Sequence, residues 1–148
     1  MPTTYRHILC PVDFSPPCRA ALRTAAELAV RFDSALTLVH VYQIAVLGYP
    51  EATPGSPFRT TMAELAGKEL AEWKHEAEKL ARRSVTAANV EGVPWDQIVK
   101  YAHEHKTDLI VVGTQGRTGL KHVLIGSVAE RVVRHAACPV LVVRESQP

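Results

Sequence analysis

Continuous apolar runs alternate with amphipathic segments along most of this chain. Five runs read as short buried strands, at residues 7–13, 35–42, 84–90, 108–112 and 139–143. Between them, apolar side chains recur at helical spacing. Ser15 and Pro16 predict the start of the first helix, with Leu22, Ala25, Ala26, Ala29 and Phe32 facing inward. Further helices are expected from Pro94 to about residue 105 and over residues 127–135.

The second helix carries a strong amphipathic pattern, and it follows a long Pro- and Gly-rich connection at residues 43–58. Its predicted inward stripe consists of Met62, Leu65, Ala66, Leu70, Trp73, Ala77 and Leu80. Because the strands are continuously apolar and alternate with helices, we expect a five-stranded parallel, doubly wound α/β sheet covered by helices on both faces.

The favoured strand order is 3-2-1-4-5, in which the first and fourth strands are neighbours at the point where the winding reverses. Ligands of such sheets bind beyond the carboxyl ends of the strands at that point. The first strand ends at Asp13 and the fourth at Gly113. This order therefore predicts that an acidic side chain and a glycine loop lie together.

Composition narrows the possible classes of protein to which this chain could belong. The 148 residues suit one domain spanning residues 1–148, and a net charge of +2 gives no support for a nucleic-acid partner. No apolar run is long enough to cross a membrane, so we expect no membrane partner. The three cysteines, Cys10, Cys18 and Cys138, are scattered without metal-ligand spacing, which favours reduced thiols and a cytoplasmic location.

A glycine-punctuated loop connects the fourth strand to the last helix. It contains Gly113, Gly116 and the pair Gly126-Ser127, and it fits neither the Walker A pattern nor the dinucleotide fingerprint. Glycines let the backbone approach an anion, and a helix N-terminus attracts it. Alternatively, the glycines serve only tight turns, and Ser127 forms a capping box with Glu130.

These motifs together resemble the universal stress protein family. The resemblance rests on the glycine loop and on four further segments, which are Pro11-Val12-Asp13-Phe14-Ser15, His40-Val41, residues 126–130 and residues 138–143. It implies a Rossmann-like fold similar to the adenine nucleotide alpha hydrolases. It also implies a bound adenine nucleotide, usually ATP, with or without Mg²⁺.

The resemblance also assigns roles to individual residues. Asp13 would bind the ribose hydroxyls, and Val41 would meet adenine through its backbone. Gly113, Gly116, Gly126 and Ser127 would surround the sugar and phosphates, and Val128 would supply a further backbone N–H. The other expected nucleotide-site residues are Pro11, Val12, Thr114 and Arg117. Arg117 could neutralise phosphate charge, although a solvated loop charge is an equal alternative.

The chemistry favours a stress-response nucleotide binder over an enzyme. We find no Walker B acid, no second acid beside Asp13 and no evident base, so we expect no catalytic residue, no metal-ligating residue and at most weak ATPase activity. The alternative is a slow ATPase or phosphotransferase using Asp13 or Ser127. A receiver domain is disfavoured because the first strand supplies only one acid. The apolar last strand, Val140–Val143, predicts a homodimer, which the family resemblance also implies.

Overall fold

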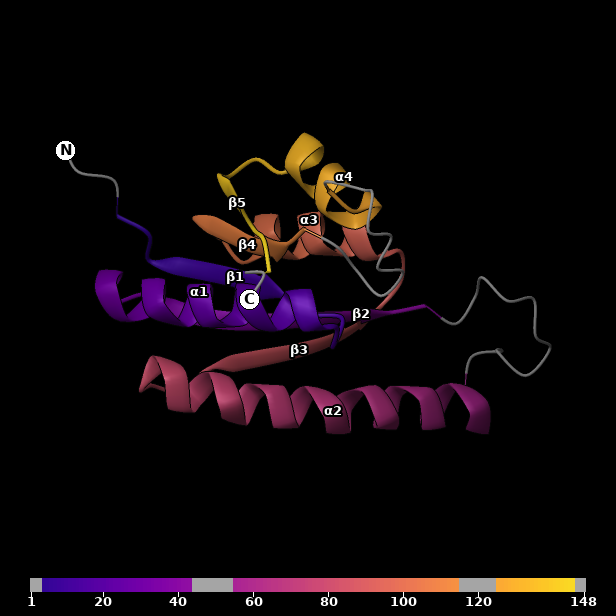
Figure 1. The fold of residues 1–148 in the computed structure, drawn as a ribbon. Coiled ribbons are helices and arrows are strands. Elements are labelled where there is room, and N and C mark those ends of the chain that lie inside the picture. Colours follow the sequence, from indigo (N-terminus) through magenta and orange to yellow (C-terminus); the bar gives the residue numbers. More distant parts are fainter. Residues whose placement is uncertain (1–3, 44–54, 115–124, 146–148) are drawn as a thin grey trace.

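Five parallel strands form a single sheet in the order β3-β2-β1-β4-β5, as the sequence predicts (Figure 1). The structure is a computed structural model, and it describes residues 4–43, 55–114 and 125–145. The strands are β1 (His7–Pro11), β2 (Ala35–Tyr42), β3 (Thr86–Glu91), β4 (Leu109–Gly113) and β5 (Val140–Val143).

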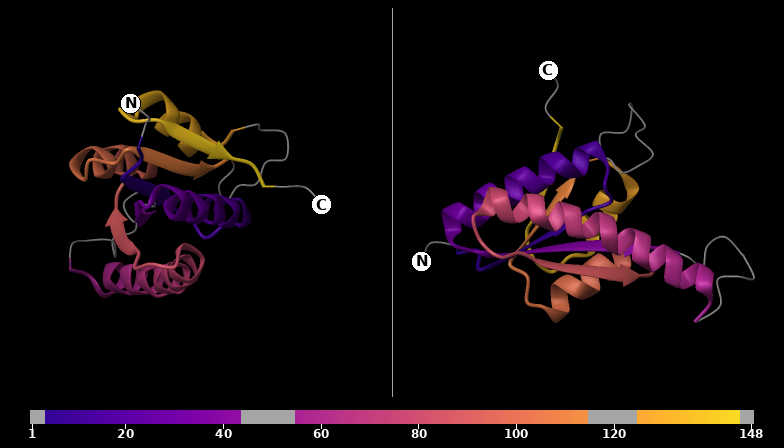
Figure 2. Two further views of the ribbon diagram at one scale, coloured as in Figure 1. Left: turned by 90° about the vertical axis from the view of Figure 1, so that its left-hand side faces the viewer. Right: turned by 90° about the horizontal axis from the view of Figure 1, so that it is seen from below.

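Helices cover both faces of this sheet. The helices are α1 (Pro16–Phe32), α2 (Pro57–Ala81), α3 (Pro94–Glu104) and α4 (Ser127–His135). Helices α1 and α2 pack together on one face, and α3 and α4 pack together on the other (Figure 2). Proline occupies the first turn of α1, α2 and α3, where its missing N–H costs no hydrogen bond.

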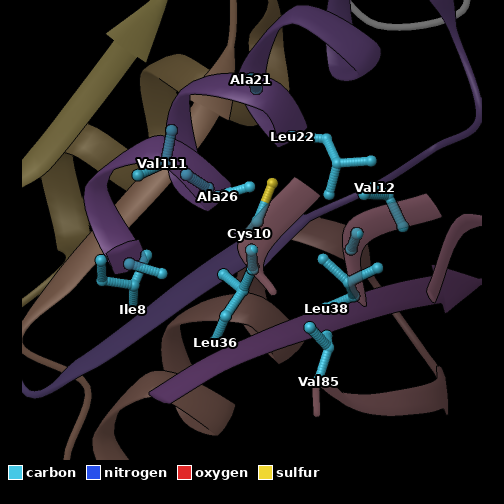
Figure 3. Close-up of a cluster of buried hydrophobic side chains, with 14 of the residues drawn as sticks. Ile8, Cys10, Val12, Ala21, Leu22, Ala26, Leu36, Leu38, Val85 and Val111 are labelled. Carbon is cyan, nitrogen blue, oxygen red and sulfur yellow. The ribbon is translucent and has the colours of Figure 1, made fainter. Parts of the chain in front are cut away.

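Two apolar clusters fill the spaces between the sheet and its helices. Alternate strand residues divide between them, so Ile8 and Cys10 face α1 and α2 while Leu9 faces α3 and α4. Figure 3 shows the first cluster, in which Cys10 lies among Ala26, Leu22 and Leu36. Trp73 from α2 is also buried there. Cys10 and Trp73 are therefore core residues, as expected.

The register of the central strands sets the position of the site. Ile8 of β1 pairs with Leu109 of β4, so the two strands run side by side and end at the same edge of the sheet. Backbone bonds continue past the strand ends: the Val12 N–H donates to the Val39 carbonyl over 2.9 Å. Asp13 and Gly113 consequently emerge together at the switch point.

The predicted inward stripes are partly wrong at the helix ends. In α2, Met62, Leu65 and Leu80 are exposed, with Leu65 at 59 %. At a rise of about 1.5 Å per residue, this 25-residue helix outruns the sheet, so its first turns have no strand to cover (Figure 1). Phe32, at the last position of α1, is likewise 38 % exposed. Only the middle of each stripe meets the core.

Strand limits differ slightly from the predicted ones. The first strand ends at Pro11 rather than Asp13, and the third covers Thr86–Glu91 rather than 84–90. Of the predicted long connection, residues 44–54 lie outside the described residues. Among the helices that the structure describes, none is long and apolar enough to span a lipid bilayer.

Candidate functional site

A cavity of about 620 Å³ opens at the carboxyl edge of the sheet. It reaches from α2 on one face to α3 and α4 on the other. Nine of the eleven predicted contact residues line it: Pro11, Val12, Asp13, Val41, Gly113, Thr114, Gly126, Ser127 and Val128. The other two, Gly116 and Arg117, lie outside the described residues. The ends of three strands and the start of one helix therefore meet at one cavity.

The N-terminus of α4 forms one end of the cavity. The predicted capping box is wrong, because Gly126 is the N-cap and Ser127 is the first helical residue. The Glu130 N–H donates to the Gly126 carbonyl over 2.9 Å. Ser127, Val128 and Ala129 line the cavity, and N–H groups in a first turn have no preceding helical carbonyl. Their unpaired donors and the helix dipole make this end attractive to an anion.

The base of the glycine loop is closed by backbone hydrogen bonds. The Gly126 N–H donates to the Thr114 carbonyl, and the Thr114 N–H donates to the Val143 carbonyl over 3.0 Å. A β-carbon at Gly113 would lie 3.0 Å from the Pro17 carbonyl oxygen and 3.3 Å from the Cys18 nitrogen. Gly113 thus permits a close approach of β4 to the first turn of α1, besides lining the cavity.

Asp13 forms a tight turn with the two residues that follow it. One carboxylate oxygen, Oδ1, accepts hydrogen bonds from the Ser15 N–H, over 2.9 Å, and from the Ser15 hydroxyl. Ser15 is the N-cap of α1, as expected, but its side chain makes no cap bond. Phe14, between Asp13 and Ser15, has a φ of 66°. This lies in the left-handed region, which costs a non-glycine residue about 1–3 kcal/mol.

Aromatic contacts hold Phe14 in that conformation. Its ring lies 4.3 Å from the His40 ring and 5.6 Å from the Trp73 ring, measured between centroids. The His40 Nδ1 is 2.8 Å from the Val12 carbonyl oxygen, and Arg19 stacks over Trp73 while pairing with Glu76. His40 is buried at the cavity wall.

The thiol of Cys18 lies beneath Asp13 at the cavity floor. Burial raises the pKa of this thiol to about 12, and the charge of the neighbouring Asp13 carboxylate adds to the effect. Burial also raises the pKa of Cys10, with a smaller contribution from Cys18. Both groups are therefore protonated and unreactive at neutral pH, as structural cysteines are.

Sequence reasoning missed the wall supplied by α2. Met62, Leu65, Ala66 and Glu69 follow one another at helical spacing and line the cavity. The helical period alone assigned the apolar members to the core, although the same period shows that Glu69 shares their face. The finding also amends the expectation of a single acid, because Asp13 and Glu69 line the same cavity.

The cavity therefore has polar groups of two kinds. Its lining includes the carboxylates of Asp13 and Glu69 and the amino end of α4. Within the described ranges, no three His, Cys, Asp or Glu side chains group closely enough to hold a metal ion. These groups suit a ligand that has both hydroxyl or amine donors and negative charge.

Comparisons with known proteins agree on one family. The model of the Universal stress protein family matches residues 4–144. Universal stress protein MJ0531 of Methanocaldococcus jannaschii is 37 % identical over 142 residues, which cover 95 % of this chain and 83 % of that protein.

Two solved structures add the fold and one ligand. UspA from Lactobacillus plantarum is 30 % identical, with a TM-score of 0.85 over 97 % of this chain and all of that chain. A universal stress protein crystallised in complex with cAMP is 26 % identical, with a TM-score of 0.70 over 97 % of this chain and all of that chain.

Proposed function

This chain belongs to the universal stress protein family, and from that premise we propose that it binds an adenine nucleotide, ATP, in the cavity at the switch point. On this proposal it acts in the cytoplasm as a nucleotide-responsive regulatory protein of the stress response, with slow or no hydrolysis. The proposal takes its ligand class from the relative crystallised with cAMP and from the chemistry of the cavity.

The observation that carries the proposal is the polarity of the cavity. A nucleotide has hydroxyl groups on its sugar and negative charge on its phosphates. Asp13 offers carboxylate acceptors to vicinal hydroxyls, while the first turn of α4 offers N–H donors to phosphate. Both features line one cavity, whose volume of about 620 Å³ falls in the range of small-molecule sites.

The remaining lining residues complete this arrangement. Val41 is the next-to-last residue of β2, where its backbone would meet the adenine edge, and Pro94 and Ile98 of α3 would supply apolar contact. The Ser127 hydroxyl is not engaged in a cap, so it can donate to a phosphate oxygen. Mg²⁺ would be held mainly by the phosphates, since no metal-ligating cluster occurs among the described residues.

Equilibrium binding of ATP to the purified protein tests the proposal. Asp13→Asn should weaken binding at least tenfold, because a charge-assisted hydrogen bond is worth about 1.5–3 kcal/mol. Asp33→Asn makes the same change at the other end of α1, where the side chain is 92 % exposed, and should leave binding unaltered. Absence of binding by the wild-type protein at millimolar ATP would refute the proposal.

Slow hydrolysis is the competing function. Phosphoryl transfer requires an oriented nucleophile and charge stabilisation in the transition state. Glu69 adds a second carboxylate, but its neighbours in the cavity include the apolar Met62, Leu65 and Ala66. Turnover by the wild-type protein that disappears in both Asp13→Ala and Ser127→Ala would favour the enzyme; product formation at the rate of buffer would exclude it.

The proposal includes a homodimer formed through β5. This strand is at the edge of the sheet, and Leu141 is 38 % exposed. An apolar edge strand has unpaired backbone groups that a second copy can satisfy.

A further inference from the structure

We propose that the turn formed by Phe14 and Ser15 positions the Asp13 carboxylate so that the cavity distinguishes ribose from 2′-deoxyribose. This inference rests on the proposed nucleotide site and deepens it. Phe14 and Ser15 would act through Asp13, as positioning residues, and the ligand class would be a ribonucleotide with both sugar hydroxyls.

The geometry of Ser15 supports the first step. A serine that begins a helix ordinarily turns its hydroxyl toward the N–H groups of the first turn. Here Pro16 and Pro17 remove two of those N–H groups, and the Ser15 hydroxyl donates to Asp13 instead. Its own N–H donates to the same oxygen, Oδ1, over 2.9 Å. Two donors from one residue, itself only 6 % exposed, fix the plane of the carboxylate.

The conformation of Phe14 supports the second step. The Ser15 N–H can turn back toward Asp13 because the intervening residue has φ 66°. A phenylalanine adopts this region only when its surroundings hold it there. The rings of His40 and Trp73 provide that restraint, at 4.3 Å and 5.6 Å from the Phe14 ring. Trp73 belongs to the buried apolar cluster beneath α1 and α2, so the turn is anchored on the core.

A carboxylate held in one orientation accounts for selectivity between ribose and 2′-deoxyribose. Vicinal hydroxyls can both donate to a carboxylate only when its plane has one particular direction relative to the sugar. A carboxylate that is free to rotate would instead adapt to a single hydroxyl. A preoriented Asp13 should therefore penalise loss of the 2′-hydroxyl more than a mobile one would, since a charged acceptor loses its expected donor.

The test compares ATP with 2′-deoxy-ATP in the wild-type protein and in two variants of Ser15. We expect the wild-type protein to bind ATP about tenfold more tightly than the deoxy form. Ser15→Ala should reduce this ratio to about twofold, and Ser15→Thr, which keeps the hydroxyl, should restore most of it. Ser84→Ala, an exposed serine outside the cavity, should leave the ratio unchanged.

A second variant tests the turn without altering Ser15. Phe14→Gly removes the aromatic restraint while allowing the left-handed conformation, so the turn becomes mobile and the ratio should again fall toward two. Thermal melting shows whether each variant is folded at the temperature of measurement. If Ser15→Ala does not fold, the ratios of ATP to 2′-deoxy-ATP affinity in the wild-type protein, Ser15→Thr and Phe14→Gly still test whether the turn positions Asp13.

The outcomes separate the two proposals. If the wild-type protein binds neither nucleotide, both are overturned. If it binds ATP and the deoxy form equally, only the positioning role fails. If Ser15→Ala weakens both nucleotides in parallel and the ratio is retained, Ser15 has a structural role alone and the inference is refuted.

Discussion

Replacing Gly113 by alanine distinguishes two reasons why a glycine follows β4. The added methyl group would lie 3.0 Å from the Pro17 carbonyl oxygen and 3.1 Å from the Pro17 carbonyl carbon. Both are backbone atoms of the first turn of α1, which cannot rotate out of the way as a flexible side chain could. Strand β4 and helix α1 must therefore separate by a few tenths of an ångström.

The expected change in the free energy of unfolding of Gly113→Ala combines two opposing contributions. Overpacking a well-filled contact costs about 1–3 kcal/mol. Reduced freedom of the unfolded chain returns about 0.4–1 kcal/mol in any Gly→Ala change that causes no strain. We therefore expect Gly113→Ala to lower the free energy of unfolding by about 0.5–2 kcal/mol. ATP affinity should fall as well, because the displaced turn of α1 follows directly from Asp13.

Gly67→Ala is the matched control. Gly67 lies inside α2, where a β-carbon would meet only the Asn89 Nδ2, at an ordinary contact distance of 3.8 Å. Alanine is favoured over glycine in helix interiors by about 0.8–1 kcal/mol, so this variant should be more stable than the wild-type protein.

Urea denaturation of both variants, monitored by tryptophan fluorescence, measures the two effects. If Gly113 served only the approach of a ligand, Gly113→Ala would gain stability as Gly67→Ala does and lose only affinity. A gain in stability at Gly113 would thus refute the close-packing argument.

Three further predictions follow from the core, the cavity floor and the sheet edge. Trp73→Ala should cost about 3–5 kcal/mol in urea denaturation, and a loss under 1 kcal/mol would contradict its buried position. Because the pKa of the Cys18 thiol is raised to about 12 from 9.0, the unfolded state loses its proton first as pH rises. Ionisation of Cys18 should therefore leave the free energy of unfolding unchanged below pH 9 and lower it by up to about 1.4 kcal/mol per pH unit between pH 9 and 12. The buried Cys10 thiol adds a fall of the same sign, so Cys18→Ala should show a shallower fall than the wild-type protein, and a fall as steep as that of the wild type would refute this cause. Val140→Lys should convert the proposed dimer to a monomer in light scattering at micromolar concentration, and an unchanged mass would place the interface elsewhere.

The topology was predictable because each element carries its own strong signal. Strand β2 was assigned with its observed limits, since a mostly apolar run that includes β-branched residues and ends in an aromatic residue favours a strand. Pro16 and Pro94 marked helix starts correctly, because proline fits the first turn and not the interior. Alternation of such elements leaves few topologies, and the switch point follows from the strand order.

The cavity wall on α2 was not predictable by the same means. Helical periodicity shows which side chains share a face, but it does not show what lies opposite that face. Leu70 and Trp73 meet the sheet, whereas Met62 and Leu65 continue the same stripe beyond its edge and meet the cavity. Only the length of α2 relative to the strands separates the two environments, and that length depends on tertiary structure.

Ser15 and Ser127, at the starts of α1 and α4, both depart from the helix-capping rule, and both departures bear on the proposed function. Helix-capping preferences assign Ser15 and Ser127 to their own helices, yet neither hydroxyl makes a cap bond. For Ser15 the competitor is the Asp13 carboxylate, since hydrogen bonds to charged groups are stronger than those to backbone N–H groups. For Ser127 the chain enters the helix one residue earlier, at Gly126. Local rules tend to fail where a site places other demands on a residue. Ser15 holds Asp13 and Ser127 begins α4, and Asp13 and Ser127 line one cavity, where the proposed ligand would require a fixed acid and uncapped helix donors.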